Sequence, residues 1–379
     1  MGYRAFIASG LLLLSNSFAS VDLYSQIEII SEFEKLQPHE EEDISNFTAT
    51  VSGMQRHHAN KTQGKNILRA FHAKSHGCLK GHLNVEKNLP NNLSQGIFIR
   101  GKTYSTIARF SNGKGLIEAD SALDVKGLAF KVLNVPGERL LKLPSYIDNT
   151  SMDFTMTNNP TPLADNVSEF ISLGTKFEAK EKEGKSLATM SPAEIKELIS
   201  NDKIYKLLID RLVKRKVSTL VTETFWSGSP YPFGKNEVGA MQAAKWNVTP
   251  CDEGHKASTS SASQDPNFLR TDLINYLQKK DLCYNLNVQI QNNKITQPIE
   301  NHLTEWKESE TASLKIATLV FKSKENTNFE KQDSLCEATS FNPWNGIKAH
   351  QPLGNMNRAR GEVYLNSFIY RINDANFRK

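Results

Sequence analysis

Two histidines, His72 and His76, stand four residues apart in a segment that begins at Arg69. On a helix this spacing would place both imidazoles on one face, where they could bind a metal ion. Gly77 follows immediately, however, and no Glu accompanies the first histidine. The segment is more typical of a turn that leads into a strand. We therefore expect a structural or surface role for His76 rather than a two-histidine metal site.

A second pair with chemical potential, Arg360 and Tyr364, stands four positions apart near the end of the chain. On a helix the two side chains would face each other. A free tyrosine has a pKa of roughly 10, and the adjacent cation would lower the pKa of the phenol. Two other segments are ordinary when taken alone. Residues 108–113 indicate a strand and a glycine loop, and Asn-Asn-Pro at 158–160 indicates a turn.

In this order along the chain, the segments resemble the catalase family. The likeness extends over residues 65–371 and includes a distal-histidine motif, a distal-asparagine segment and a proximal tyrosine motif. The matching elements are Arg69-x-x-His72-Ala-Lys74, Arg109-Phe-Ser111, Asp124-x-x-Gly127-x-Ala129-x-Lys131, the segment 153–160, and Arg360-x-x-x-Tyr364 with Arg371 seven residues further on.

The resemblance implies a bound haem b and a role for each matching side chain. Tyr364 would ligate the haem iron as a phenolate, helped to ionise by Arg360. His72 would be the distal acid–base, oriented by Ser111, and Asn158 would hydrogen-bond the peroxide. Arg69, Arg109 and Arg371 would bind the haem propionates. The implied reaction is cleavage of a peroxide O–O bond on the Tyr364-ligated iron.

Two departures from the family pattern favour a peroxidase with weaker catalase activity. Phe71 stands before His72, where catalases usually have a small aliphatic residue, and the chain stops eight residues after Arg371. We therefore expect no C-terminal helical domain, and a monomer or dimer rather than an interwoven tetramer. The substrates would be hydrogen peroxide or organic peroxides, with a small organic reductant. Two alternatives stay open: a fatty-acid hydroperoxide isomerase like allene oxide synthase, and a non-catalytic haem-binding secreted protein.

The elements that must position these residues are both strands and helices. Strand patterns occur at 97–100 and 128–132, and strict alternation of apolar and polar residues predicts strands at 284–290 and 314–322. Ser191 to Glu194 forms a capping box that predicts a helix, and a second helix should begin at Asp265. These patterns predict an α+β fold with an antiparallel β-barrel and surrounding helices.

The chain divides into three predicted parts. Residues 1–19 have Arg4, an apolar run and a small-x-small pattern that ends at Ala19, as in a secretory signal peptide. Residues 20–64 are polar and predict an N-terminal arm with one short helix near residues 25–36. Residues 65–379 would form the catalase-like haem-binding domain. The mature protein is therefore expected in the periplasm or outside the cell.

Export permits disulfides, and the chain has four cysteines. Cys251 follows one apparent strand and Cys283 opens another, so we expect these two to form a disulfide if the strands are antiparallel neighbours. Cys78 and Cys336 are expected to be reduced and buried.

Charge and hydropathy argue against nucleic-acid binding and against a membrane span in the mature chain. The net charge is only +5, and Lys and Arg are scattered among acidic residues, so nucleic-acid binding is not expected. No stretch after residue 19 is long and apolar enough to predict a membrane span. Hydrophobic residues make up 39% of the chain, which is sufficient for a packed core.

Overall fold

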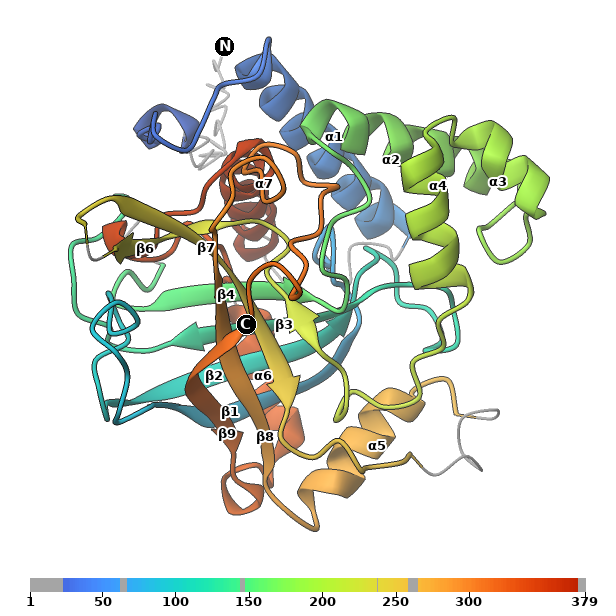
Figure 1. Cartoon of the computed structure of the whole chain (residues 1–379). Helices are drawn as coiled ribbons and strands as arrows, with labels where there is room; N and C mark the ends of the chain where they lie inside the picture. Colours follow the sequence, from blue (N-terminus) through green and yellow to red (C-terminus); the bar gives the residue numbers. More distant parts are fainter. Residues whose placement is uncertain (1–22, 62–66, 144–146, 237, 258–264, 374–379) are drawn as a thin grey trace, which may run out of the picture.

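The computed structural model describes residues 23–61, 67–143, 147–236, 238–257 and 265–373; the predicted signal peptide lies outside them. Within these ranges, nine strands form one antiparallel sheet in the order β5-β4-β3-β2-β1-β9-β8-β7-β6 (Figure 1). The bounds are β1 (Ser75–Val85), β2 (Thr103–Asn112), β3 (Lys126–Val132), β4 (Met152–Thr157), β5 (Phe225–Trp226), β6 (Tyr231–Lys235), β7 (Met241–Pro250), β8 (Leu282–Ile290) and β9 (Leu314–Phe321). Because β5 also pairs with β7, the sheet closes into a barrel, and β6 extends it beside β7.

Side-chain alternation along the strands separates the core of the barrel from its outer face. Phe110, Phe130 and Phe154 from β2, β3 and β4 are buried inside with Trp246 of β7, and the rings of Phe130 and Phe154 stack 4.6 Å apart. Because successive side chains of a strand point to opposite faces, the neighbours of these aromatic residues point outward. The aromatic interior therefore leaves the outer face of the barrel for other contacts.

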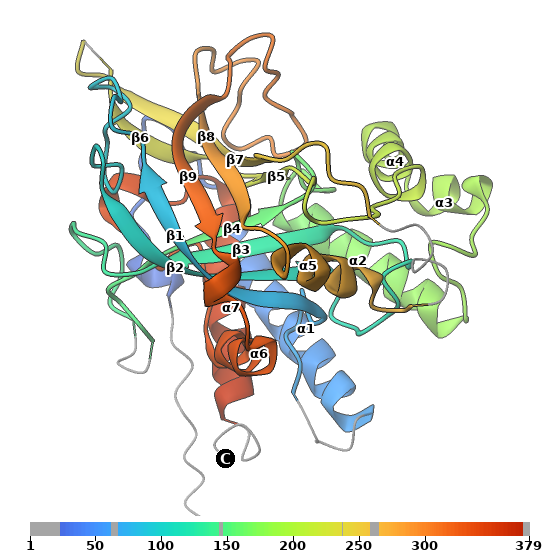
Figure 2. The ribbon, with the colours of Figure 1, turned by 90° about the horizontal axis from the view of Figure 1, so that it is seen from below.

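Helices pack around the barrel. Their bounds are α1 (Glu40–Lys61), α2 (Val167–Lys182), α3 (Pro192–Leu198), α4 (Asp202–Leu208), α5 (Phe268–Leu277), α6 (Phe329–Ala338) and α7 (Asn355–Ile372). Helix α7 packs against α1, and α6 packs against β1 and β2 (Figure 2). The predicted α+β barrel with surrounding helices is confirmed, as is the capping box of Ser191 and Glu194 at the start of α3. No helix among the described residues is long and apolar enough to cross a membrane.

The N-terminal arm differs from its prediction. In place of the helix predicted near residues 25–36, the structure has a 3-10 helix at Tyr24–Gln26 and a turn at residues 31–33, and the long helix of the arm is α1. Four acidic residues in the first turn of α1 stabilise its positive end, and Ile44, Phe47 and Val51 recur on one buried face. The acidic run and the apolar spacing predict a helix over residues 40–61, so the helix predicted near residues 25–36 is wrong.

The predicted strand at residues 97–100 is also wrong. Gly96 and Gly101 have positive φ angles of 54° and 70°, and the residues between them form turns. Ile97 and Phe98 are both buried, and the centre of the Phe98 ring lies 5.5 Å from that of Trp246, so the apolar run reflects packing into the core. A short apolar run therefore marked a buried turn rather than a strand.

The arm is held to α7 by a buried ion cluster. Arg358 contacts the carboxylates of Glu34 at 2.5 Å, Glu40 at 2.5 Å and Glu300 at 3.2 Å. Glu34 and Glu300 also accept hydrogen bonds from the first amides of α7 and its cap, Gly354 N and Asn355 N. Arg358 therefore neutralises all three carboxylates, and the positive end of α7 also stabilises those of Glu34 and Glu300.

Both pairs of cysteines form disulfides. The predicted Cys251–Cys283 bond is confirmed, because antiparallel pairing of β7 with β8 brings the two Cα atoms within 5.5 Å. The expectation of reduced Cys78 and Cys336 is wrong, because these residues form a second disulfide with a Cα–Cα distance of 5.8 Å. They are 258 residues apart in sequence, and only the packing of α6 on β1 brings them together.

Candidate active site

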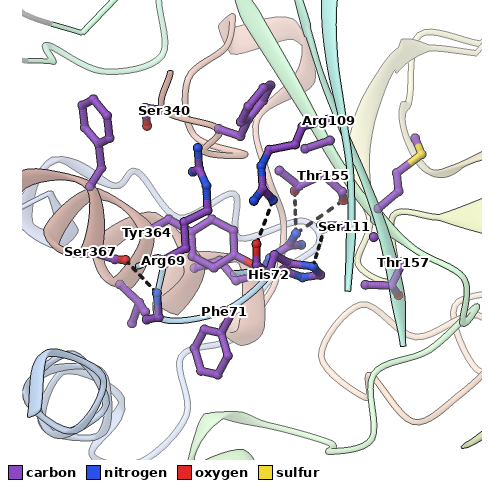
Figure 3. Close-up of a pocket in the computed structure, with 18 of the residues that line it drawn as sticks. Arg69, Phe71, His72, Arg109, Ser111, Thr155, Thr157, Ser340, Tyr364 and Ser367 are labelled. Atoms are coloured by element: carbon purple, nitrogen blue, oxygen red, sulfur yellow. Dashed lines mark hydrogen bonds between the residues drawn. The ribbon is translucent and has the colours of Figure 1, made fainter. Parts of the chain in front are cut away.

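A pocket lies on the outer face of the barrel, between strands β2 to β4 and helix α7 (Figure 3). It is partly open to solvent and is lined by both apolar and charged side chains, as small-molecule and cofactor sites are. The residues predicted from the sequence that line it are Arg69, His72, Arg109, Ser111, Arg360, Tyr364 and Arg371. The structure therefore brings together residues that are up to 302 positions apart in the chain.

Strand register places the barrel side of this pocket in two rows. Ser111, Gly127 and Thr157 lie opposite one another across β2, β3 and β4, and Arg109, Ala129 and Thr155 form the next row. All of these residues line the pocket. The small side chains at the middle of each row, Gly127 and Ala129, leave a shallow floor between polar residues on both sides.

His72 is held in an unusual backbone conformation. Its φ is 59°, a left-handed value that costs a residue other than glycine about 1–3 kcal/mol. The backbone amide of His72 donates to Gly113 O at 2.8 Å, and its Nδ1 lies 3.1 Å from Ser111 Oγ. A Cβ on Gly127 would lie 2.5 Å from Nδ1, so glycine is required for this approach. The predicted contact between His72 and Ser111 is present.

The environment of His72 keeps its imidazole neutral. Burial, followed by the positive charge of Arg109, lowers the pKa of His72 to about 4. Arg109 is close because its Nη1 donates to the backbone oxygen of His72 at 2.7 Å. At neutral pH the side chain is therefore an uncharged base.

Arg360 and Tyr364 lie one turn apart on α7, as their spacing predicts, with the guanidinium carbon of Arg360 5.5 Å from the centre of the Tyr364 ring. Arg360 also donates to Thr155 Oγ1 at 2.5 Å, which fixes it against β4. Burial alone would lower the pKa of Arg360, but the phenols of Tyr364 and Tyr231 raise it. Arg360 is thus a permanent cation beside Tyr364, whose ring extends from α7 into the pocket (Figure 3).

The other three predicted arginines gather at one end of the pocket around Glu337. Glu337 lies 3.0 Å from Arg109, 3.6 Å from Arg69 and 3.9 Å from Arg371. Burial lowers the pKa of Arg69 well below its usual value, and the charges of Arg371 and Arg109 lower it further. Burial would raise the pKa of Glu337, but the three arginines hold it below its usual value. One carboxylate is therefore shared by three cations, of which Arg109 and Arg371 are buried.

Asn158 is the one predicted site residue that does not line the pocket. Its Nδ2 donates to Glu223 Oε2 at 2.9 Å, and its Oδ1 accepts from Lys126 N at 2.8 Å. Arg215 completes the group, donating to Glu223 at 2.6 Å and to Asn158 O at 2.7 Å. Thr157, the preceding residue, faces the pocket instead. A hydrogen bond from Asn158 to a peroxide stays a prediction.

His76 lies outside the pocket and is fully buried. Its Nε2 is 2.8 Å from Asn112 Oδ1, which also accepts from Lys126 Nζ at 2.7 Å. The side chain therefore has a structural role, and a surface position is excluded. No group of three or more His, Cys, Asp or Glu in the described part of the chain is arranged to hold a metal ion.

Phe71 lines the pocket and also packs against the helices beside it. Its ring centre lies 6.3 Å from that of Phe47 on α1 and 6.1 Å from that of Phe170 on α2. In Figure 3 the ring lies on the side of the pocket opposite Arg109. The aromatic group gives one side of the pocket an apolar wall.

Comparison with solved structures identifies the architecture that carries this pocket. A fungal catalase matches with a TM-score of 0.63 and 17% sequence identity, over 85% of this chain and 62% of its own. A bacterial catalase matches with the same TM-score and 18% identity, over 85% and 60%. Catalase A from Saccharomyces cerevisiae matches with a TM-score of 0.63 and 15% identity, over 83% and 63%. The chain has the catalase fold.

No protein-family model matches the chain, and no curated protein matches it. The chain spans 60 to 63% of the length of the catalases named above.

Within the catalase fold, sequence reasoning missed two residues that organise the pocket, Thr155 and Glu337. Thr155 positions Arg360, and its outward place on β4 follows from the alternation of that strand. Glu337 binds arginines from β2 and α7, and no local pattern marks it. Glu223, which binds Arg215 and Asn158 outside the pocket, was missed as well. The arginines around Glu337 come together through packing between elements, and the spacing of residues along one element does not predict such contacts.

Proposed function

We propose that the pocket binds haem b and that the protein reduces hydrogen peroxide or organic peroxides with electrons from a small organic donor. One observation carries the proposal. Tyr364 with its cation Arg360, on α7, and His72 with Ser111, on the barrel side, line the same pocket. A phenol that can ligate iron and a neutral base that can move a proton are thus placed on a shared cavity.

The residues of the pocket fit a flat group with two carboxylates. Tyr364 would hold the iron, and Arg69, Arg109 and Arg371 would hold the propionates. The three guanidiniums with the carboxylate of Glu337 have a net charge of +2, which matches two propionates. Arg69 Nε is buried and makes no hydrogen bond within the described residues, so a donor remains for such a ligand. Gly127 and Ala129 leave room on the floor of the pocket.

When bound, haem would supply the iron centre at which peroxide is reduced. The contribution of the chain is proton transfer. If the Nδ1 hydrogen of His72 is donated to Ser111 Oγ, Nε2 has the lone pair that accepts a proton from the peroxide. The low pKa of His72 then favours return of that proton to the departing oxygen. Ser111 holds the imidazole in the orientation that this requires.

The walls of the pocket favour peroxidase turnover over disproportionation of hydrogen peroxide. Phe71, Val363 and Phe368 are apolar lining residues, and the cavity is partly open to solvent. An apolar, accessible wall suits an organic peroxide or an aromatic electron donor. Disproportionation requires two small peroxides in succession, and nothing in this wall selects for small molecules.

The test is a direct comparison on one haem-loaded preparation. Oxygen release from hydrogen peroxide is measured against oxidation of a phenolic dye, with both hydrogen peroxide and an organic hydroperoxide. We expect dye oxidation to exceed oxygen release. Dominant oxygen release with negligible dye oxidation would reverse the ranking. Conversion of a fatty-acid hydroperoxide without use of a donor would favour an isomerase, and no turnover of a fully loaded protein would favour a haem-binding protein.

A further inference from the structure

The last turn of α6 supplies acceptors to all three arginines at the end of the pocket. Arg69 Nη2 donates to Cys336 O at 2.6 Å and to Thr339 O at 3.0 Å. Arg371 Nη1 donates to Glu337 O at 2.8 Å. Arg109 Nε donates to Glu337 Oε1 at 3.0 Å. The positions of the guanidiniums therefore depend on where this turn lies.

The Cys78–Cys336 disulfide fixes that turn to the barrel. Cys336 directly precedes Glu337, and Cys78 lies opposite Arg109 in the pairing of β1 with β2. A closed loop thus runs from Cys78 through the disulfide to Cys336 and Glu337, then through the ion pair to Arg109 and back across the strand pair. The backbone amide of Cys78 also donates to Asp333 of α6 at 3.1 Å.

The arginines need such a restraint because their charges repel one another. The pKa of Arg371 is lowered to about 10, chiefly by burial and also by Arg109, against the opposing effect of Glu337. Three like charges around one carboxylate repel one another, and the carboxylate offsets that repulsion only while it stays among them. Both cysteines are fully buried, so the disulfide is shielded from solvent and forms part of the packed wall behind the cluster.

We propose that the Cys78–Cys336 disulfide and Glu337 are positioning elements for a dicarboxylate ligand, holding Arg69, Arg109 and Arg371 where they meet two carboxylates at once. The inference rests on the haem site proposed above. It concerns the carboxylate end of that site and is independent of iron ligation by Tyr364. It predicts that breaking the disulfide weakens binding of the diacid selectively, because the arginines contribute little to a ligand without carboxylates.

The test uses iron-free protoporphyrin IX and its dimethyl ester, which differ only in the two carboxylates. Binding of each to the apoprotein is measured by fluorescence titration for the wild type and for the double variant Cys78→Ala/Cys336→Ala. We expect the variant to bind the diacid about 10- to 100-fold more weakly, by analogy with the loss of a residue that orients the ligands of a metal ion. Affinity for the ester should be nearly unchanged, because the ester has no carboxylates for the arginines to bind.

The matched control is Cys251→Ala/Cys283→Ala, which removes the disulfide between β7 and β8. It should leave both affinities at wild-type values. A Cys78→Ala/Cys336→Ala variant with wild-type affinity for the diacid would overturn the inference, and so would an equal loss for the diacid and the ester. Wild-type protein that binds neither protoporphyrin IX nor haem would overturn the proposed function as well.

A second variant keeps the inference testable if the alanine pair does not fold. Glu337→Gln preserves size and removes the shared negative charge. We expect it to weaken diacid binding, since the amide cannot hold three guanidiniums together. Stronger diacid binding would show that Glu337 competes with the ligand rather than positioning its receptors, and would overturn the inference.

Discussion

His72 Nδ1 and Ser111 Oγ lie 3.1 Å apart, and Gly127 occupies the space beside both atoms. The pair forms where a residue with a left-handed backbone meets an outward-facing residue of β2. A Cβ added to Gly127 would lie 2.5 Å from the imidazole and 2.8 Å from the hydroxyl. The absence of one side chain on β3 is thus a condition for the geometry of the proposed base.

Gly127→Ala tests this condition. We expect the methyl group to displace His72 and lower kcat/KM for peroxide at least about tenfold, the lower end of the effect of a positioned acid–base group. Overpacking should also destabilise the fold by about 1–3 kcal/mol. Gly174→Ala is the control, because a Cβ there has no neighbour within 4 Å, and alanine should stabilise α2 by about 0.4–1 kcal/mol. Unchanged kcat/KM in Gly127→Ala would contradict the assignment of His72.

The pH dependence of turnover follows from the pKa of His72. A free histidine titrates near about 6.5, but the pKa of His72 is lowered to about 4. The imidazole must be neutral to accept a proton, so activity is lost as pH falls through the pKa. We expect kcat/KM to be constant through pH 6.5 and to decline only as pH approaches 4, with circular dichroism as a check on folding. A decline centred near about 6.5 would show a solvated histidine.

Arg358 provides a test of how the N-terminal arm is held. Arg358→Met leaves the carboxylates of Glu34, Glu40 and Glu300 without their cation. We expect the free energy of unfolding to fall by about 3–5 kcal/mol in urea titrations. The control Lys214→Met removes an exposed ion pair with Asp210 and should leave the free energy of unfolding nearly unchanged. An equal effect of the two substitutions would mean that the cluster does not stabilise the arm.

Local patterns in the sequence predicted those parts of the fold that are decided within one element. Alternation predicted β8 and β9, the capping box predicted α3, and four-residue spacing placed Arg360 and Tyr364 on one helix. The order of the motifs along the chain is the basis of the resemblance to catalases, and that resemblance assigned to one site the seven residues that line the pocket.

Contacts between distant elements were not predictable in this way. The Cys78–Cys336 disulfide joins β1 to α6, and the position of Glu337 among three arginines depends on the same packing. Residues 97–100 show the opposite failure, because their apolar character comes from burial at a turn and not from strand periodicity. An apolar run in the sequence indicates that a segment is buried, but it does not indicate which other element the segment packs against.

Export remains a prediction of the sequence, since residues 1–19 lie outside the described part of the chain. Two disulfides in the structure are compatible with an oxidising compartment. We expect the mature protein, isolated from its native host, to begin at Ser20. Sequencing of its N-terminus gives the answer directly, and a mature pool that begins at Met1 would reject the signal peptide.

The central claim is that Tyr364 binds the iron of haem in this pocket. Titration of apoprotein with haem, followed by absorption in the Soret region, tests it with two variants on the same helix. Tyr370→Phe is the control, because Tyr370 lies on α7 but does not line the pocket. We predict that wild-type protein and Tyr370→Phe bind one equivalent of haem with identical Soret bands, and that Tyr364→Phe loses stable loading. A full and unshifted Soret band in Tyr364→Phe would contradict the account.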